Sequence, residues 1–292
     1  MLLVAGAGGL VGRAAVAYFR GVGGEVATAS HHPGGGLHID LADAASVAAL
    51  RIPTAVTHAL VCSSITNIDE CFRRPVETGR FNVDNTIALL RRLLDRGVQP
   101  VYCSSDLVFL GDRGNYAEDD PREPATEYGR QKKVVEDFLL GQAAPSLILR
   151  MSKLYSTGLD DTSPIAQMVR ALLAGNSIRC AYDQVVCPTW VEDVPRAVHA
   201  LLQAGATGTY HVAAPERFTR LSLGVAVAAA VGRPGLVERC SIRDFTFAEP
   251  RPLDNSLRTD RLTAATGFRF HALAAHLPAI VALHRAGQGA PR

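Results

Sequence analysis

The sequence predicts an α/β fold in which a doubly wound parallel sheet carries helices on both faces, followed by a smaller C-terminal region. Two observations predict it. Short apolar runs alternate with stretches of helical periodicity through the first half of the chain, as in successive βαβ units. A glycine-rich run at residues 6–12 lies between the first apolar run and the first helical stretch. Right-handed crossovers between parallel strands then place helices on both faces of the sheet, which is the doubly wound arrangement.

The regular alternation ends near residue 155, which suggests where the first domain ends. We expect residues 1–155 to form that domain and residues 156–292 to form mainly a second region, with residues 188–213 returning to the first. A length of 292 residues suits a main domain with a smaller partner. The stretch 158–164 is expected to be an exposed loop in which Asp160 and Asp161 face solvent.

Each expected strand is a short apolar run bounded by polar or turn residues. In chain order these runs are Leu2–Ala5, Glu25–Ala29, Ala59–Cys62, Pro100–Ser104 and Ser146–Leu149. Each expected helix has apolar residues three or four positions apart. In chain order the helices are Leu10–Arg20, Ala44–Leu50, Glu77–Arg96 and Glu127–Leu140, and Gly97 ends the third.

Composition excludes several classes of protein. The net charge is +2, from 30 basic and 28 acidic residues, and no dense Lys/Arg cluster occurs, so we expect no nucleic-acid partner. No run reaches the roughly 18 apolar residues of a membrane span. The six cysteines form no C-x-x-C pair, which favours a reducing compartment. Since the first strand begins near residue 2, we read no targeting segment and expect a cytoplasmic protein.

The glycine run has the spacing of a dinucleotide-binding loop of the Rossmann type. Gly6 allows a tight turn, Gly9 lets the backbone approach a pyrophosphate, and Gly12 lets the helix pack closely on the strand. The helix then offers free N–H groups and the positive end of its dipole to the phosphates. We expect the cofactor to contact Gly6, Gly8, Gly9, Leu10, Val11 and Gly12.

The end of the second strand bears on which cofactor is bound. An NAD site usually places Asp or Glu there to hold the ribose 2′-hydroxyl, and this chain has Ser30 and His31 instead. A carboxylate would repel a 2′-phosphate, whereas Ser30, His31 and Arg13 could accept one. We therefore favour NADP(H), with NAD(H) as the alternative. If Ser30 and His31 are only loop residues, they make no cofactor contact. Asp40 and Leu41 are placed to flank the adenine.

Tyr128 and Lys132 form a Y-x-x-x-K pair on one face of an expected helix. A phenol has an unperturbed pKa of about 10 and needs help to exchange protons at neutral pH. A nearby ammonium and an oxidised nicotinamide are expected to lower the pKa of Tyr128, which then acts as the proton donor or acceptor at a carbonyl. Lys132 could also hold the nicotinamide ribose. Ser105, after the preceding strand, can hydrogen-bond the substrate oxygen. These three residues are the predicted catalytic set.

Several motifs in order carry a family resemblance over residues 1 to about 265. The glycine run, Ser105, Tyr128 and Lys132 together resemble the extended short-chain dehydrogenase/reductases, and more narrowly their dTDP-4-dehydrorhamnose reductase branch. Stretches similar to that branch are 104–109 (SSDLVF), 116–136 (from YAEDD to YGRQKKVVE), 183–189 (DQVVCPT) and 251–262 (from RP to L).

The resemblance implies reduction of a keto group on a nucleotide-activated sugar of the 4-keto-6-deoxyhexose type. Hydride would come from NADPH, Tyr128 would protonate the oxygen and Ser105 would orient it. The resemblance also implies that Cys62, Ser63 and Ser64 line the cofactor, and that Asn82 braces the site. Implied substrate contacts are Ser104, Ser105, Asp106, Lys153, Gln184, Trp190 and Arg251.

Some positions depart from the branch. Leu107 stands where the related 4,6-dehydratases carry a Glu beside their Asp, which disfavours dehydration. Leu110 and Val186 replace the branch's usual Asp and Gly. Lys153 stands where the rhamnose enzymes carry a Trp near the sugar, so dTDP-4-dehydrorhamnose itself is in doubt. A Lys there could meet a phosphate or a carboxylate, or lie in solvent at the cleft rim.

Two other functions fit the resemblance. One is a sugar-nucleotide epimerase that holds and recycles NAD. The other is a binding partner like the regulatory subunit of methionine adenosyltransferase, which resembles the same branch. A homodimer is possible. His31, His32 and His38 lie near one another, but no further residue at ligand spacing accompanies them, so we predict no metal site.

Overall fold

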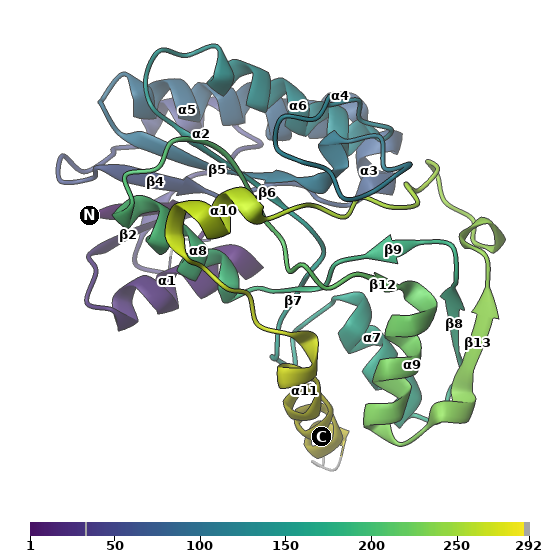
Figure 1. The fold of residues 1–292 in the computed structure, drawn as a ribbon. Coiled ribbons are helices and arrows are strands. Elements are labelled where there is room, and N and C mark those ends of the chain that lie inside the picture. The colour runs from purple at the N-terminus through teal and green to yellow at the C-terminus, as the bar shows by residue number, and fades with distance from the viewer. Residues whose placement is uncertain (33, 289–292) are drawn as a thin grey trace.

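A computed structural model of the chain describes residues 1–32 and 34–288, and it has two lobes (Figure 1). The larger lobe is built on a seven-stranded sheet of order β11-β6-β5-β4-β1-β2-β3. Every neighbouring pair of its strands is parallel. The doubly wound parallel sheet predicted from the sequence is confirmed. The strand order reverses between β1 and β4, where such sheets bind ligands at their carboxyl edge.

The elements of the larger lobe begin and end close to where the sequence predicted. Its strands are β1 (Leu2–Ala5), β2 (Val26–Ser30), β3 (Leu37–His38), β4 (His58–Val61), β5 (Gln99–Ser105), β6 (Leu147–Met151) and β11 (Gly208–Val212). Its helices are α1 (Leu10–Gly21), α2 (Ala44–Ala49), α3 (Ile68–Arg73), α4 (Pro75–Gly79), α5 (Thr86–Leu94), α6 (Glu127–Leu140), α8 (Asp193–Gln203) and α10 (Asp260–Thr266). The two-residue β3 was missed because so short a strand has no readable pattern.

The long helix expected at residues 77–96 is interrupted by a π-helical turn, Arg80–Asn85. Two buried asparagines explain the interruption, because their amides bond to distant backbone: Asn82 Nδ2 donates to Ile65 O at 2.9 Å and Asn85 Nδ2 donates to Leu41 O at 2.8 Å. Such turns occur frequently at functional sites. Asn82 is therefore held where the ends of β4 and α6 meet.

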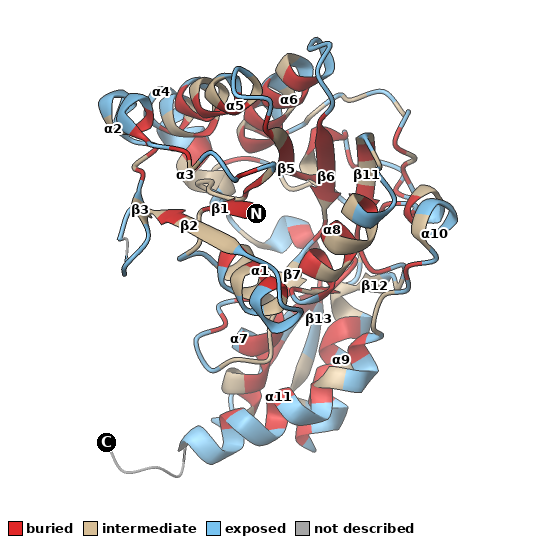
Figure 2. Cartoon of the chain, turned by 90° about the vertical axis from the view of Figure 1, so that its left-hand side faces the viewer, coloured by how far each residue is buried: buried red, intermediate tan, exposed pale blue. Residues whose placement is uncertain are grey.

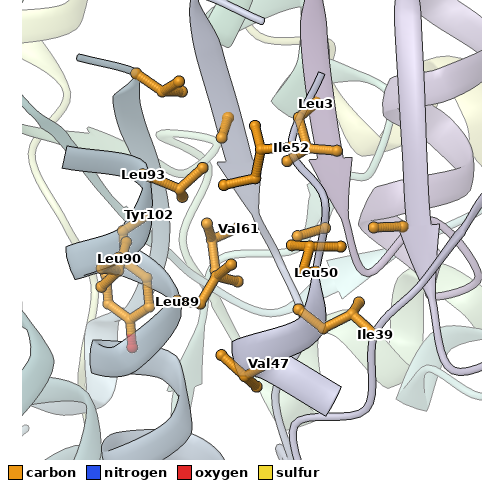
Figure 3. Close-up of a cluster of buried hydrophobic side chains, with 14 of the residues drawn as sticks. Leu3, Ile39, Val47, Leu50, Ile52, Val61, Leu89, Leu90, Leu93 and Tyr102 are labelled. Carbon is orange, nitrogen blue, oxygen red and sulfur yellow. The ribbon is translucent and has the colours of Figure 1, made fainter. Parts of the chain in front are cut away.

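Two hydrophobic layers cover the faces of the sheet. One face packs against α2, α5 and α6 through residues such as Leu3, Val61, Leu89 and Leu90, which Figure 3 shows interlocking. The other face packs against α1, α8 and α10, with Leu262 and other residues of that layer buried. Figure 2 shows the central strands buried along much of their length. The carboxyl ends of β1, β4, β5 and β6 are therefore fixed relative to one another.

The smaller lobe is connected to the sheet by the segments that follow β6 and β11 (Figure 1). Its strands are β7 (Leu154–Tyr155), β8 (Ile178–Ala181), β9 (Val185–Val186), β10 (Thr189–Trp190), β12 (Phe218–Thr219) and β13 (Val237–Cys240), and its helices are α7 (Pro164–Leu173), α9 (Arg220–Val231) and α11 (Leu273–Gln288). These helices share a separate apolar core. None of the helices in the described ranges is long and apolar enough to cross a membrane.

The loop before α7 is more ordered than the sequence suggested. Asp161 is only 4% exposed, and its carboxylate accepts hydrogen bonds from Ser156 N, Ser163 N and Ser163 Oγ. The expectation that Asp161 faces solvent is wrong, because its carboxylate satisfies the backbone donors of the turn that starts α7. Asp160 is exposed, as expected, and is paired with Arg13 at 2.7 Å.

Candidate active site

A cleft of about 860 Å³ runs along the carboxyl edge of the sheet, and both lobes line it. Nearly all of the predicted site residues border this cleft. They are Gly6, Gly8, Gly9, Leu10, Val11, Ser30, His31, Asp40, Leu41, Cys62, Ser63, Ser64, Ser104, Ser105, Asp106, Tyr128, Lys132, Lys153, Gln184 and Arg251. Gly12 and Trp190 are not among its lining residues. Since a concave site with converging polar groups is the usual form of a ligand site, this cleft is the candidate active site.

The glycine run borders one end of the cleft, where its glycines have no side chains to fill the space. Gly6 has a φ of +102°, a conformation that favours glycine, and a Cβ there would lie 2.7 Å from Ser63 N. A Cβ on Gly12 would lie 2.0 Å from Gly6 O. Gly12 therefore serves the close approach of α1 to the loop rather than the cleft itself. Gly9 is the N-cap of α1 and offers no side chain to its first N–H groups.

Replacing Gly12 by Ala is expected to push α1 away from the loop and to weaken NADPH binding by about tenfold or more, since the added methyl must displace backbone. Gly21→Ala is the matched control, because a Cβ on Gly21, in the last turn of the same helix, meets nothing within 4 Å. Isothermal titration with NADPH measures both variants. Equal affinity of the Gly12→Ala variant and the parent would show that the close contact does not shape the loop.

The residues at the end of β2 carry hydroxyl and imidazole groups, and the carboxylate of Asp40 reaches them from the segment after β3. Ser30 Oγ donates to His32 O at 2.9 Å, and His31 Nδ1 lies 3.3 Å from Asp40 Oδ2. Arg13, which the sequence offered as a further partner for a 2′-phosphate, is not a lining residue. Its guanidinium donates to Gly8 O and to Asp160 instead. Among the described residues that border this end of the cleft, His31 and His32 are the side chains able to carry positive charge.

Tyr128 and Lys132 lie on the buried face of α6, and Thr126 caps the helix by accepting from Gly129 N. Lys132 Nζ donates to Cys103 O at 2.9 Å and lies 5.6 Å from the centre of the Tyr128 ring. Burial lowers the pKa of Lys132 to about 8. Both side chains border the cleft one helical turn apart, as the Y-x-x-x-K spacing predicted.

Burial raises the pKa of Tyr128 well above 10, and the hydroxyl of Ser64 nearby only partly opposes this effect. The expected lowering of the Tyr128 pKa by Lys132 is not found in the protein alone, because desolvation of the phenolate is the largest effect on this pKa. The phenol stays protonated at neutral pH, which is the form that a proton donor requires.

Ser104 and Ser105 are adjacent but point to different partners. Ser105 Oγ donates to Asp106 Oδ1 at 2.9 Å and accepts from Leu107 N at 3.2 Å. Burial raises the pKa of Asp106 to about 6. Ser104 Oγ donates to Glu136 Oε1 at 2.5 Å, so its hydroxyl is directed into the protein although the residue borders the cleft. Ser105 is thus the better placed of the two to meet a substrate oxygen.

Asn82 joins two parts of the site. Its Oδ1 accepts from Ile65 N at 2.8 Å and from Ser64 Oγ at 3.0 Å, and its Nδ2 donates to Gln131 Oε1 at 2.8 Å. The segment after β4 and the helix carrying Tyr128 and Lys132 are thereby held by one buried amide.

The smaller lobe brings Lys153, Gln184 and Arg251 to the other end of the cleft. Arg251 Nη2 donates to Asp69 Oδ1 at 2.7 Å, and Gln184 Nε2 donates to Pro252 O at 2.8 Å. Trp190 is placed elsewhere. Its ring lies 4.0 Å from that of His276 and 4.9 Å from that of His271, within the smaller lobe's core. We therefore leave Trp190 out of the substrate site.

Comparison with known proteins decides the family. The RmlD substrate binding domain family matches residues 1–285. The chain belongs to this family. The probable low-salt glycan biosynthesis reductase of Haloferax volcanii is 28% identical over 278 residues, covering 90% of this chain and 91% of that protein. The dTDP-4-keto-6-deoxy-D-glucose reductase of Streptomyces niveus is 30% identical over 211 residues, covering 72% and 71%.

A solved structure of dTDP-4-dehydrorhamnose reductase from Bacillus anthracis in complex with NADP superposes with a TM-score of 0.84 at 20% identity, covering 94% of this chain and 96% of that one. At this identity the likeness shows the fold. The RmlD family match and the fold agree with the resemblance drawn from the sequence motifs.

Two residues of this RmlD-family chain were missed in the sequence. Arg220, the first residue of α9, borders the cleft and donates from Nε to Gln184 Oε1 at 2.5 Å. Asn255 donates from Nδ2 to Asp106 O at 3.1 Å and so holds the loop after Ser105. Arg220 lies outside the recognised motifs, and Asn255 occupies an unspecified position within the 251–262 stretch. The change from strand to helix after residue 219 is the sequence feature that could have drawn attention to Arg220.

Proposed function

We propose that the chain uses NADPH to reduce a keto group on a nucleotide-activated sugar. The observation that carries this proposal is that Ser105, Tyr128 and Lys132 border the same cleft as the glycine run. The 4-keto-6-deoxyhexoses named in its relatives are the first sugars to assay.

The cleft fits a dinucleotide. Gly6 has no room for a side chain, and the N–H groups at the start of α1 face the phosphates that would lie there. The bound cofactor would supply a hydride to the keto carbon. Ser105 Oγ then orients the keto oxygen, Tyr128 donates the proton to it, and Lys132 holds the nicotinamide ribose and keeps a positive charge beside the forming phenolate. We propose that residues 156–292 mainly bind the substrate.

The cysteines bear on the cellular compartment of the protein. All six cysteines are free, which supports a reducing compartment such as the cytoplasm. Cys62 and Cys103 lie at or next to the proposed cofactor site, and burial raises the pKa of both thiols, so they stay protonated and unreactive there.

An assay of NADPH oxidation over a panel of nucleotide 4-keto sugars tests the proposal. Stoichiometric loss of NADPH with the sugar is expected. An epimerase would convert sugar without net loss of cofactor, and a regulatory subunit would turn over no sugar and would co-purify with a synthetase. Either of those results would replace the reductase proposal.

His31→Ala is expected to weaken NADPH binding by about tenfold, the worth of one charge-assisted hydrogen bond, and to leave NADH binding nearly unchanged. The imidazole of His31 borders the cleft where a 2′-phosphate would lie. His38→Ala is a control, since His38 lies near His31 but is not a lining residue. Michaelis constants for both cofactors measure the effect, and equal losses for NADPH and NADH would contradict the assignment.

The alkaline limb of the pH profile should follow Lys132. Its pKa is lowered to about 8, so the ammonium predominates below that pH and is lost as the pH rises through it. We expect kcat/KM for NADPH, which reports the free enzyme, to fall about tenfold for each pH unit above that value. In Lys132→Arg the guanidinium stays charged, so the fall should move to higher pH even if the plateau is lower. An unchanged limb would assign it to another group.

A further inference from the structure

Two cations, Lys153 and Arg220, border the cleft from different segments, and neither forms an ion pair with a described residue. Lys153 follows β6, and Arg220 opens α9 in the smaller lobe. Both also line a small adjoining hollow with Val186 and Pro188. The two positive groups therefore face the same space from two parts of the chain.

The neighbouring cation has a carboxylate in contact, whereas Lys153 and Arg220 contact none among the described residues. Arg251 is paired with Asp69 at 2.7 Å and lies 4.5 Å from the centre of the Phe247 ring. Arg220 donates from Nε to the neutral Gln184 Oε1, which fixes the guanidinium without reducing its charge. Partial withdrawal from water, and then Arg220, lower the pKa of Lys153. Lys153 is exposed in the open cleft and Arg220 is half-buried, and an anion bound between them would reduce the repulsion that Arg220 exerts on Lys153.

Strand register places Lys153 at the reacting end of the cleft. Ser105 in β5 pairs with Met151 in β6. Asp106 and Lys153 leave the same edge of the sheet, one and two residues beyond that pair, and the charge of Asp106 favours the charged form of Lys153. Asp106 in turn accepts from Ser105, the proposed partner of the keto oxygen. In a sugar reduced at C4, the diphosphate at C1 lies on the far side of the ring, whereas a substituent at C6 lies near the reacting carbon.

We infer that Lys153 and Arg220 bind a carboxylate on the sugar, so that the chain selects an acidic nucleotide sugar. This inference rests on the proposed reduction of a nucleotide-linked sugar, and it departs from the 4-keto-6-deoxyhexoses, whose C6 is a methyl group, by requiring a carboxylate at C6. A guanidinium can hold both carboxylate oxygens in its planar fork, and the ammonium adds a point charge beside it. Gln184 positions Arg220 for that contact.

UDP-glucuronic acid and UDP-glucose are matched probes, because they differ only in the carboxylate or hydroxymethyl at C6. Each is titrated calorimetrically into the protein saturated with NADP⁺. The acid is expected to bind about tenfold or more tightly, the worth of a charge-assisted pair. Lys153→Met and Arg220→Gln should each abolish that preference by lowering the affinity for UDP-glucuronic acid much more than the affinity for UDP-glucose. Lys153→Arg should keep it. Lys133→Met is the matched control, since Lys133 is half-buried outside the cleft and paired with Asp137.

Three results would overturn the inference. Equal affinity of the parent for both probes would show that no carboxylate is recognised. Equal losses for both probes in Lys153→Met would show that Lys153 binds the diphosphate. If NADP⁺ bound and neither UDP-sugar did, the inference would fail, and only the absence of NADPH loss over the panel of nucleotide 4-keto sugars would refute the proposed function as well, which separates the two failures. NADP⁺ affinity and thermal midpoint, measured for each variant, confirm that the fold is intact.

Discussion

Replacing Tyr128 by Phe is expected to lower kcat by about 100- to 10,000-fold, the usual worth of a positioned general acid. The phenol is 7% exposed, borders the cleft and remains protonated because burial raises its pKa. Phe fills the same volume and removes only the donated proton. The Michaelis constants should change little, because the phenol donates its proton mainly in the transition state.

Tyr102→Phe is the matched control for this prediction. Tyr102 is buried beside Lys132, whose Nζ lies 4.8 Å from its ring centre, and its hydroxyl has no hydrogen-bond partner among the described residues. The same loss of a hydroxyl should there leave the rate near that of the parent. Steady-state and single-turnover kinetics with NADPH compare the two variants. A Tyr128→Phe enzyme as fast as the parent would mean that another group supplies the proton.

The main lobe could be predicted because its signals are local. Apolar runs of strand length and helical spacing repeat from Leu2 to Met151, and each expected element of that stretch is found within a few residues. The spacing of the glycines predicted the loop before α1, because the conformation of this loop depends on the backbone of neighbouring residues and not on distant contacts. The π-helical turn at Arg80–Asn85 could not be predicted, since it depends on two amides that bond to distant backbone.

The direction of side chains was harder to predict than their position in the chain. Ser104 and Ser105 were both expected to face the substrate, but successive residues of a strand point to opposite faces, and Ser104 reaches Glu136. Trp190 follows a motif that borders the cleft, yet packs in the smaller lobe's core. Arg220 reaches the cleft only because α9 docks beside Gln184. Such contacts depend on how the lobes pack, which no local pattern encodes.

The hydroxyl of Ser104 bonds to Glu136, and Glu136 belongs to a buried network whose disruption should lower the stability of the fold. Glu136 is fully buried, and Arg150, only 1% exposed, donates to it from Nε at 3.0 Å and from Nη2 at 2.8 Å. Arg150 also donates to Glu118 O at 2.8 Å, and Arg122 donates to Glu136 at 3.1 Å. This network joins α6 to the ends of β5 and β6, which present Ser105 and Lys153.

Arg150→Met is expected to lower the free energy of unfolding by about 3–5 kcal/mol, because Glu136 is left buried with part of its compensating charge removed. Arg258→Met is the control, since Arg258 and Asp260 form an exposed pair at 2.7 Å that should be worth about 0–1 kcal/mol. Urea denaturation measures both. The double variant Glu136→Met/Arg150→Met removes both charges and should recover part of the loss. If Arg150→Met cost no more than the exposed control, α6 would be held to the sheet by its apolar contacts alone, and the position of Tyr128 would not depend on this ion pair.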